Sequence, residues 1–470
     1  MKEIKTEEKN SVGMIMSYAT GKFLAEFLTG AYGIMVFFFF EKEMHLNPWY
    51  VTIATIIYAI WNAINDPLIG FLTNKRAPMS KTFGRRFPWI VIGLTFCLLS
   101  FCLIFALPKS WANTINARAI FIWMVIFVCL YDAFYTLWEV NYQSLYPDKF
   151  RNEKERIRVS GISTAIGVLG IVAGFLIPPM FYEYENPASF AKAAVVILLI
   201  GIVVSILGIP GLKENKKMIE RFKTKQAFEK EHPEEKVPFV QSMKINLKNR
   251  NLLGLLLSMF FYQSGCMCMT SSVNYVVSGI LNKPSSASTP IMASMLVGAL
   301  LSILIWTRVS KKITNNINML IITCFIMAIF CIPMTFMRTT LGYIIFMGLW
   351  GLGFGGFWTF SIPGMADIVD DLVVQQKKRN DGIVMGLRAF FMRLSYAVQA
   401  ITFALCHQLT GFNPESGAIQ TETAKMGISL HFALFPAIYF ILSALCLIII
   451  CNLSNEKIQY NHKELKALNL

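Results

Sequence analysis

Apolar residues along this chain come in long stretches interrupted by short polar connections. A helix that crosses a bilayer needs about 20 predominantly apolar residues. Twelve stretches reach that length, and the pattern predicts a transmembrane helix in each. They cover roughly 14–40, 48–73, 87–107, 117–146, 158–183, 190–212, 251–281, 286–309, 315–337, 341–368, 382–411 and 428–453.

Basic residues concentrate in every second connection, which fixes a predicted topology. One side carries the N-terminus, 75–86, 149–158, 213–250, 308–312, 377–379 and the C-terminal tail. Because cytoplasmic loops are enriched in Lys and Arg, both termini are predicted to be cytoplasmic, in the plasma membrane. No cleaved signal peptide is expected. The predicted domains are a six-helix bundle over 1–213, a cytoplasmic linker over 214–250, and a second six-helix bundle with a short tail over 251–470.

Composition supports a membrane protein. Of the 470 residues, 55% are hydrophobic and 15% are charged, against roughly 25% charged residues in soluble domains. The net charge of +15 is interpreted as the bias of cytoplasmic loops, so no nucleic-acid partner is expected. The ten cysteines lie in apolar stretches and do not resemble a disulfide framework. No Walker A motif, nucleophile–base pair or metal cluster is found, so we expect a monomeric transporter without a cofactor rather than an enzyme.

Ionisable residues inside the predicted spans are the informative ones, because each costs roughly 2.5–3.5 kcal/mol at the bilayer centre. Several share a helix face at a spacing of three or four residues. A polar solute pathway would explain them; side-chain pairing that only fixes packing is the alternative, and it is equally open for Asp132, Lys22 and Arg388. The set comprises Lys22 and Glu26, then Asn62, Asn65 and Asp66, then Asp132, Thr136 and Glu139, and finally Arg388 and Arg393.

Two further groups lie toward the ends of the spans. Asp367 and Asp370 are predicted at the cytoplasmic end of the tenth span, where a gating or surface-pairing role is expected. His45, His407 and His431 are predicted near the outer face, scattered and unlike a metal site.

The sequence WNAINDPLIGFLTNK, followed by FGRRFPWI, resembles a family signature. It is similar to the glycoside–pentoside–hexuronide:cation symporters, the melibiose-permease branch of the major facilitator superfamily. TLWEVNYQSLYP, EKERIRVS and FWTFSIPGMADIVDD match further segments in the same order. The resemblance implies an all-α fold of 12 transmembrane helices in two pseudo-symmetric six-helix bundles, which transports by alternating access.

The resemblance also implies roles for individual residues. The coupling cation, Na⁺ or H⁺, would be held by Asn62, Asn65, Asp66 and Thr136. Asn62 stands where the family has a carboxylate, which predicts weaker Na⁺ binding, coupling to H⁺, or none. A sugar, glycoside or uronide would meet Glu26, Tyr135, Glu139, Trp358 and Arg393, with Lys22 and Arg388 beside them. Arg85 and Arg86 resemble a gating loop.

Three alternatives remain open at this stage. A lysolipid or other organic-anion carrier would use the same fold, and the basic residues of the eleventh span would suit its charge. A uniporter or exchanger would dispense with Na⁺ coupling. A sensor would bind a solute without transporting it.

Overall fold

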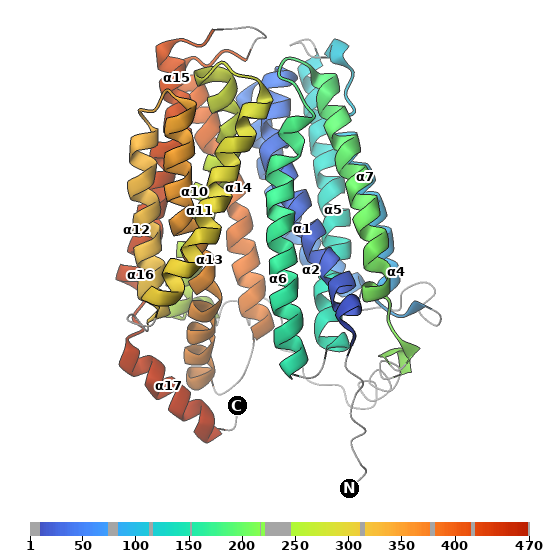
Figure 1. Ribbon diagram of the computed structural model, residues 1–470, viewed down its shortest axis with the longest axis vertical. Coiled ribbons are helices and arrows are strands. Elements are labelled where there is room, and N and C mark those ends of the chain that lie inside the picture. Colours follow the sequence, from blue (N-terminus) through green and yellow to red (C-terminus); the bar gives the residue numbers. More distant parts are fainter. Residues whose placement is uncertain are drawn as a thin grey trace. The chain divides into compact units, whose positions relative to one another are not determined.

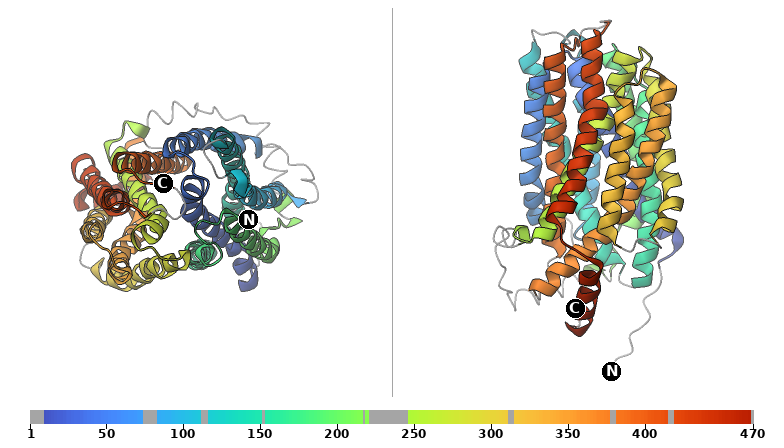
Figure 2. Two further views of the ribbon diagram at one scale, coloured as in Figure 1. Left: turned by 90° about the horizontal axis from the view of Figure 1, so that it is seen from above. Right: turned by 90° about the vertical axis from the view of Figure 1, so that its left-hand side faces the viewer.

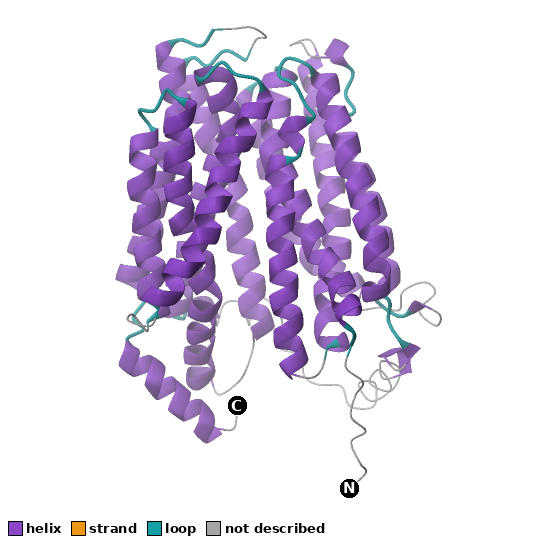
Figure 3. Cartoon of the chain, in the orientation of Figure 1, coloured by secondary structure: helices purple, strands orange, loops and turns teal. Residues whose placement is uncertain are grey.

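The computed structural model describes residues 10–73, 83–111, 116–150, 153–216, 218–220, 246–310, 315–376, 381–414 and 419–468. These residues form helices joined by short connections, and the described part contains no strand (Figure 3). Helices are expected here because hydrocarbon offers no hydrogen-bond partner to an unpaired backbone group. All ten cysteines are described, and none is in a disulfide.

The chain divides into two compact units. Unit 1 comprises residues 1–39 and 60–234, and unit 2 comprises residues 40–59 and 235–470. The outer part of the α1–α2 connection therefore packs with the second half of the chain. The predicted linker over 214–250 lies largely outside the described residues.

Unit 1 contains the following helices (Figure 1): α1 (Val12–Phe38), the part of α2 (Pro48–Thr73) from residue 60 onward, α4 (Phe87–Ile104), α5 (Ala117–Lys149), α6 (Glu153–Leu176) and α7 (Pro187–Leu212). Helix α1 packs against α6 and α7, and α4 packs against α5 and α7.

Unit 2 contains the first part of α2 together with α10 (Arg250–Tyr275), α11 (Ser288–Val309), α12 (Asn316–Met334), α13 (Thr340–Gln376), α14 (Asp381–Thr410), α15 (Glu422–Ser429), α16 (Phe435–Ile450) and α17 (Asn455–Leu468). Helix α10 packs against α14 and α16, and α12 packs against α13 and α16. The packing pairs of unit 1 thus recur in unit 2, as expected for two related halves.

Two features of unit 2 were not predicted. Among the described residues, three segments widen into π-helical turns: η1 (Phe39–Glu43), η5 (Val276–Ile280) and η7 (Leu430–Leu434). The C-terminal tail forms helix α17, which lies beyond the end of α16 (Figure 2). The tail lacks an apolar stretch, so hydropathy alone gave no helix there.

Eleven helical segments of the described residues are long and apolar enough to cross a membrane. They correspond to eleven of the twelve predicted spans. The remaining predicted span is the second one, at 48–73. It corresponds to α2, a helix of 26 residues that carries the Asn-Asp-Pro motif. The predicted spans therefore all coincide with helices, although α13 continues to Gln376, beyond the expected end at 368.

Helix starts follow from local side-chain chemistry. The Ser11 hydroxyl accepts a hydrogen bond from the Met14 N–H at 3.2 Å, and Asn249 caps α10 by accepting from the Leu252 N–H at 2.9 Å. At α4 the cap comes from a distant residue: the Glu214 carboxylate accepts backbone hydrogen bonds from Arg86 at 2.5 Å and Phe87 at 3.2 Å. Such caps satisfy N–H groups that the helix itself leaves unpaired.

Glycines allow α1 and α6 to touch through their backbones. A Cβ atom at Gly170 would collide with the Phe23 carbonyl oxygen, and one at Gly174 would lie 2.6 Å from the Phe27 carbonyl oxygen. Small residues at such crossings let transmembrane helices approach closely. Gly161, which is also on α6, faces open space.

We therefore expect Gly170→Leu to destabilise the protein by about 1–3 kcal/mol or more, because the larger side chain forces the α1–α6 crossing apart. Gly161→Leu is the matched control and should leave stability unchanged. Thermal unfolding of both variants in detergent, followed by size-exclusion chromatography, measures the effect. Equal melting temperatures for the two variants would contradict this account of the crossing.

Candidate cation and solute sites

A cluster of amides and carboxylates joins α2 to α5 within unit 1. The Asn62 Nδ2 donates to Asp132 Oδ1 at 2.5 Å, and the Asn65 Nδ2 donates to Asp132 Oδ2 at 3.1 Å. One turn further along α5, the Thr136 hydroxyl donates to Asp66 Oδ1 at 2.9 Å. All four predicted cation residues therefore lie in this cluster, together with Asp132.

Asp132 is central to the cluster, although neither its sequence position nor the family resemblance predicted a cation role for it. It is only 2% exposed, and it receives both amide groups of α2. The signal was present in the sequence, because Asp132 shares a helix face with Thr136 at a spacing of four. What periodicity could not show is that this face meets Asn62. Asp132 places a carboxylate beside the position where the resemblance led us to expect one.

The donor set of the cluster suits a hard cation. Carboxylate, amide and hydroxyl oxygens are the ligands that Na⁺-like cations prefer. The Asn62 Oδ1 is buried and accepts no hydrogen bond, so an oxygen donor is available without breaking an existing contact. The cluster contains only two carboxylates, and the described part of the chain contains no group of three His, Cys, Asp or Glu side chains arranged to hold a metal ion.

A second cluster in unit 1 joins α1 and α5. The Lys22 Nζ lies 2.6 Å from Glu26 Oε1, one helical turn away. Glu139 on α5 interacts electrostatically with both of these residues and accepts a hydrogen bond from Gln143. The Tyr135 hydroxyl donates to the Ala25 carbonyl oxygen at 3.3 Å. The structure thus brings together four predicted solute residues: Lys22, Glu26, Tyr135 and Glu139. They place two carboxylates and one ammonium group on a partly exposed surface.

The remaining predicted solute residues lie in unit 2. Arg393 on α14 interacts electrostatically with Tyr58 and Tyr396, whose rings meet edge to face at 5.6 Å. Arg388, just over one turn earlier, has a buried Nε that makes no hydrogen bond. Trp358 on α13 is 40% exposed. A guanidinium with an unused donor favours an anionic ligand.

Three of the four predicted gating residues, Arg85, Arg86 and Asp367, have hydrogen bonds within their own units. The backbone N–H groups of Arg85 and Arg86 bind the Glu214 carboxylate at the start of α4. Asp367 Oδ2 accepts from the Asn316 Nδ2 at 2.8 Å. Its neighbour Asp371 is almost fully buried and pairs with Lys457 of α17 at 3.1 Å, a contact that the sequence gave no reason to expect.

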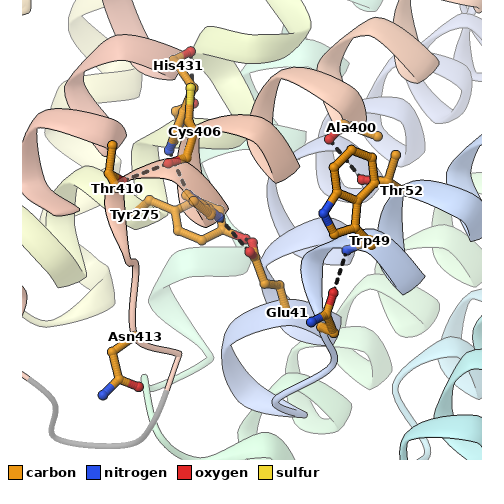
Figure 4. A network of polar contacts seen from close by, with 12 residues as sticks. Glu41, Trp49, Thr52, Tyr275, Ala400, Cys406, Thr410, Asn413 and His431 are labelled. Carbon is orange, nitrogen blue, oxygen red and sulfur yellow. Dashed lines mark hydrogen bonds and ion pairs between the residues drawn. The ribbon is translucent and has the colours of Figure 1, made fainter.

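The expectation that the histidines are scattered was wrong for two of the three. His407 on α14 and His431 on η7 are buried side by side, with their Nε2 atoms 2.9 Å apart. The His407 Nδ1 meets Glu41 Oε1 at 2.5 Å, and Tyr275 donates to the other oxygen of Glu41 (Figure 4). The sequence does show that Glu41 directly follows the apolar run FFFF and is therefore expected to be buried. It could not show the histidine partners, because they are hundreds of residues away along the chain.

Comparison with known proteins identifies the family. The family described as MFS/sugar transport protein matches residues 17–454. This chain belongs to that family. The match confirms the resemblance stated from the helix 2 motif, and it identifies the chain as a multi-pass membrane transporter of small-molecule solutes rather than an enzyme.

Individual relatives of this transporter differ in the solutes named for them. The sodium-dependent lysophosphatidylcholine symporter 1 of Gallus gallus is 21% identical over 99% of this chain and 91% of its own length. The raffinose carrier protein of Pediococcus pentosaceus is 25% identical over 57% of this chain and 40% of its own length. The crystal structure of the nucleoside transporter NupG matches with a TM-score of 0.60, at 10% identity, over 94% of this chain and 100% of that one. The likeness to NupG confirms the predicted fold.

The α2–α5 cluster yields a stability test. Asn62→Asp would set a second carboxylate against Asp132, and we expect a loss of about 3 kcal/mol in Na⁺-free buffer because like charges then face each other in a buried site. Added Na⁺ should restore part of that loss. Thermal unfolding with and without Na⁺, at constant ionic strength with choline, measures it.

Asn141→Asp is the matched control, because Asn141 is equally buried on α5 and its side chain bonds only the Leu137 carbonyl oxygen. It should be destabilised without any Na⁺ rescue. Equal responses of the two variants to Na⁺ would rule out a cation site at Asn62.

Proposed function

We propose that this transporter is a Na⁺-coupled symporter whose solute is an amphiphile of the lysophospholipid class. The observation that carries the coupling is the α2–α5 cluster, in which Asp132 accepts from two amides of α2 and Asp66 accepts from Thr136, one turn further along α5. We further propose a plasma-membrane location with cytoplasmic termini, on the basis of the alternating basic connections.

The cluster holds two carboxylates, the buried Asp132 and the half-buried Asp66. Uncompensated burial of an ionised carboxylate is strongly unfavourable, so a monovalent cation would lower the free energy of the loaded site. Asn62, which departs from the expected carboxylate, is offset by Asp132 from the neighbouring helix. This geometry supports Na⁺ coupling in spite of the altered motif, and the relatives named as sodium-dependent symporters are consistent with it.

Two observations support an amphiphilic solute with a phosphate group. The relatives named as lysophosphatidylcholine symporters align over nearly the whole chain, whereas the raffinose carrier aligns over little more than half. Arg388 and Arg393 add two cations on one helix, and the Arg388 Nε has an unused hydrogen. Arginine binds phosphate oxygens through several parallel hydrogen bonds, which matches such a headgroup.

A glycoside remains the second candidate solute. Glu26 and Glu139 provide acceptors for sugar hydroxyls beside the ring of Tyr135, on the α1–α5 surface of unit 1. Carboxylates accept such hydrogen bonds strongly, and an aromatic ring packs on the apolar face of a pyranose.

In either case the cation and the solute act on one another through linkage. If Na⁺ raises the affinity for the solute, the solute raises the affinity for Na⁺ by the same factor. Transport then follows from alternate exposure of the loaded sites to the two sides of the membrane.

The deciding experiment compares solutes in proteoliposomes that contain the purified protein. A fluorescent lysophosphatidylcholine is added outside, and its protection from extraction by albumin reports transport. Raffinose, other glycosides and uronides are tested by counterflow. We expect Na⁺-dependent protection of the lysolipid. Counterflow of glycosides without lysolipid protection would favour the second candidate, and binding without flux of any solute would overturn the symporter proposal.

Asp66→Asn should abolish Na⁺-driven accumulation while leaving solute exchange at zero gradient measurable, because the change removes the charge but keeps a group that can bond Thr136. Glu422→Gln, at an exposed glutamate of α15 that pairs with Lys425, is the control and should accumulate solute normally. Accumulation by Asp66→Asn vesicles at the wild-type level would remove Asp66 from the coupling site.

Arg393→Gln should raise the apparent KM for an anionic or zwitterionic solute about tenfold, since a charge-assisted hydrogen bond contributes about 1.5–3 kcal/mol. Arg338→Gln is the control, because Arg338 bonds the Met337 carbonyl oxygen in the α12–α13 turn. The measurement is initial uptake against solute concentration at saturating Na⁺. An unchanged KM would exclude Arg393 from headgroup binding.

A further inference from the structure

Unit 2 buries a continuous chain of hydrogen bonds that the cation and solute sites do not use. It runs from Glu41 on η1 through His407 and His431 to Ser272 on α10, and every link is 2.9 Å or shorter. Glu41, His431 and Ser272 have no exposed surface, and His407 is 2% exposed. Figure 4 shows Glu41 directed toward Tyr275, which donates to its second carboxylate oxygen.

The chain is fully satisfied when Glu41 is ionised and both imidazoles are neutral. His407 then donates from Nδ1 to Glu41, and His431 donates from Nε2 to the His407 Nε2. The His431 Nδ1 must accept, so the Ser272 hydroxyl donates to it. In this arrangement every N–H or O–H donor of the network has an acceptor, and no two acceptors face each other.

The same atoms are equally well satisfied with one more proton. A proton on the His431 Nδ1 donates to Ser272, and the Ser272 hydroxyl turns to the Cys268 carbonyl oxygen, which lies 2.5 Å away. Passing protons along the chain then leaves Glu41 as a carboxylic acid that donates to the His407 Nδ1, with both imidazoles neutral. Only hydrogens move between these arrangements.

Two further charged residues lie beside the hydrogen-bonded chain. Lys42 and Glu43 follow Glu41 along η1, are both buried, and have opposite charges. Lys42 lies over the Phe412 ring, which itself stacks on His407 at 4.2 Å, and Glu43 acts electrostatically on Tyr275. Since Lys42 and Glu43 offset each other, an ionised Glu41 leaves one buried negative charge, which a single proton removes.

The backbone around the chain is also unusual. Glu41 lies in η1, His431 lies in η7, and Tyr275 directly precedes η5, so all three π-helical turns meet at this network. Single π-helical turns are rare and are found frequently at functional sites. These turns place side chains from three separate segments of the chain within one hydrogen-bonded network.

We propose that Glu41, His407, His431 and Ser272 form a proton-binding site, separate from the α2–α5 cation cluster, that holds one transferable proton. Its ligand is the proton itself, bound between the α1–α2 connection and helices α10 and α14. Residues 40–59 also bind α14 through the Thr52 hydroxyl, which donates to the Ala400 carbonyl oxygen at 3.0 Å (Figure 4).

The test counts protons on the intact protein and needs no solute. Potentiometric titration of the folded wild type between pH 8.5 and 5.5 is compared with Glu41→Gln, which keeps an acceptor for His407 but removes the charge. We expect the variant to bind about one proton fewer. Glu422→Gln, at an exposed glutamate paired with Lys425, is the control and should match the wild type.

Identical titration curves for the wild type and a folded Glu41→Gln would overturn the site. Should Glu41→Gln fail to fold, Glu41→Leu serves in its place, since it also removes the carboxyl group that holds the added proton, and equal curves would be just as decisive. In proteoliposomes, Asp66→Asn should lose Na⁺ dependence yet keep the titration of the wild type. Failure of solute transport would therefore count against the proposed function and leave the proton count intact.

Discussion

Hydrocarbon offers a buried charge neither water nor a mobile counter-ion, and this constraint organises the polar interior of the protein. Backbone groups are satisfied within each helix, so the ionisable side chains have to find partners on other helices. Asp132 does so through two amides of α2, and Glu41 through Tyr275 and His407. Each of these carboxylates fixes the position of helices that are remote along the chain.

The two clusters show how neighbours decide what a buried carboxylate can do. Around Asp132 the partners are amides, which donate hydrogen bonds but do not accept a proton at physiological pH, so a cation is the natural way to offset the charge. Around Glu41 the partners are imidazoles, which exchange protons readily. Similar acidic groups in similar burial are therefore suited to different ligands, and the difference lies in the residues that surround them.

Hydropathy and charge were sufficient to predict the helices and the family, because bilayer thickness dictates the length of each apolar stretch. The pairing of Lys22 with Glu26 was equally accessible, since both lie on one helix turn. The bond from Asn62 to Asp132 was not, because helical periodicity gives the face of a residue but not the helix that the face will meet. The same limit hid the contact of His407 with His431, and the polar composition of α17 concealed a helix that docks through Lys457 and Asp371.

Unit 2 contains another glycine-lined crossing, where a Cβ atom at Gly298 of α11 would strike the Gly348 carbonyl oxygen of α13, as at the α1–α6 crossing of unit 1. No side chain is immobilised where two backbones meet, so such a contact forms at little cost in rotamer entropy. Each pair of helices that crosses in this way therefore moves as one rigid unit. Distortion introduced by a bound solute therefore has to be accommodated in the turns and connections that flank these helix pairs, rather than within the pairs themselves.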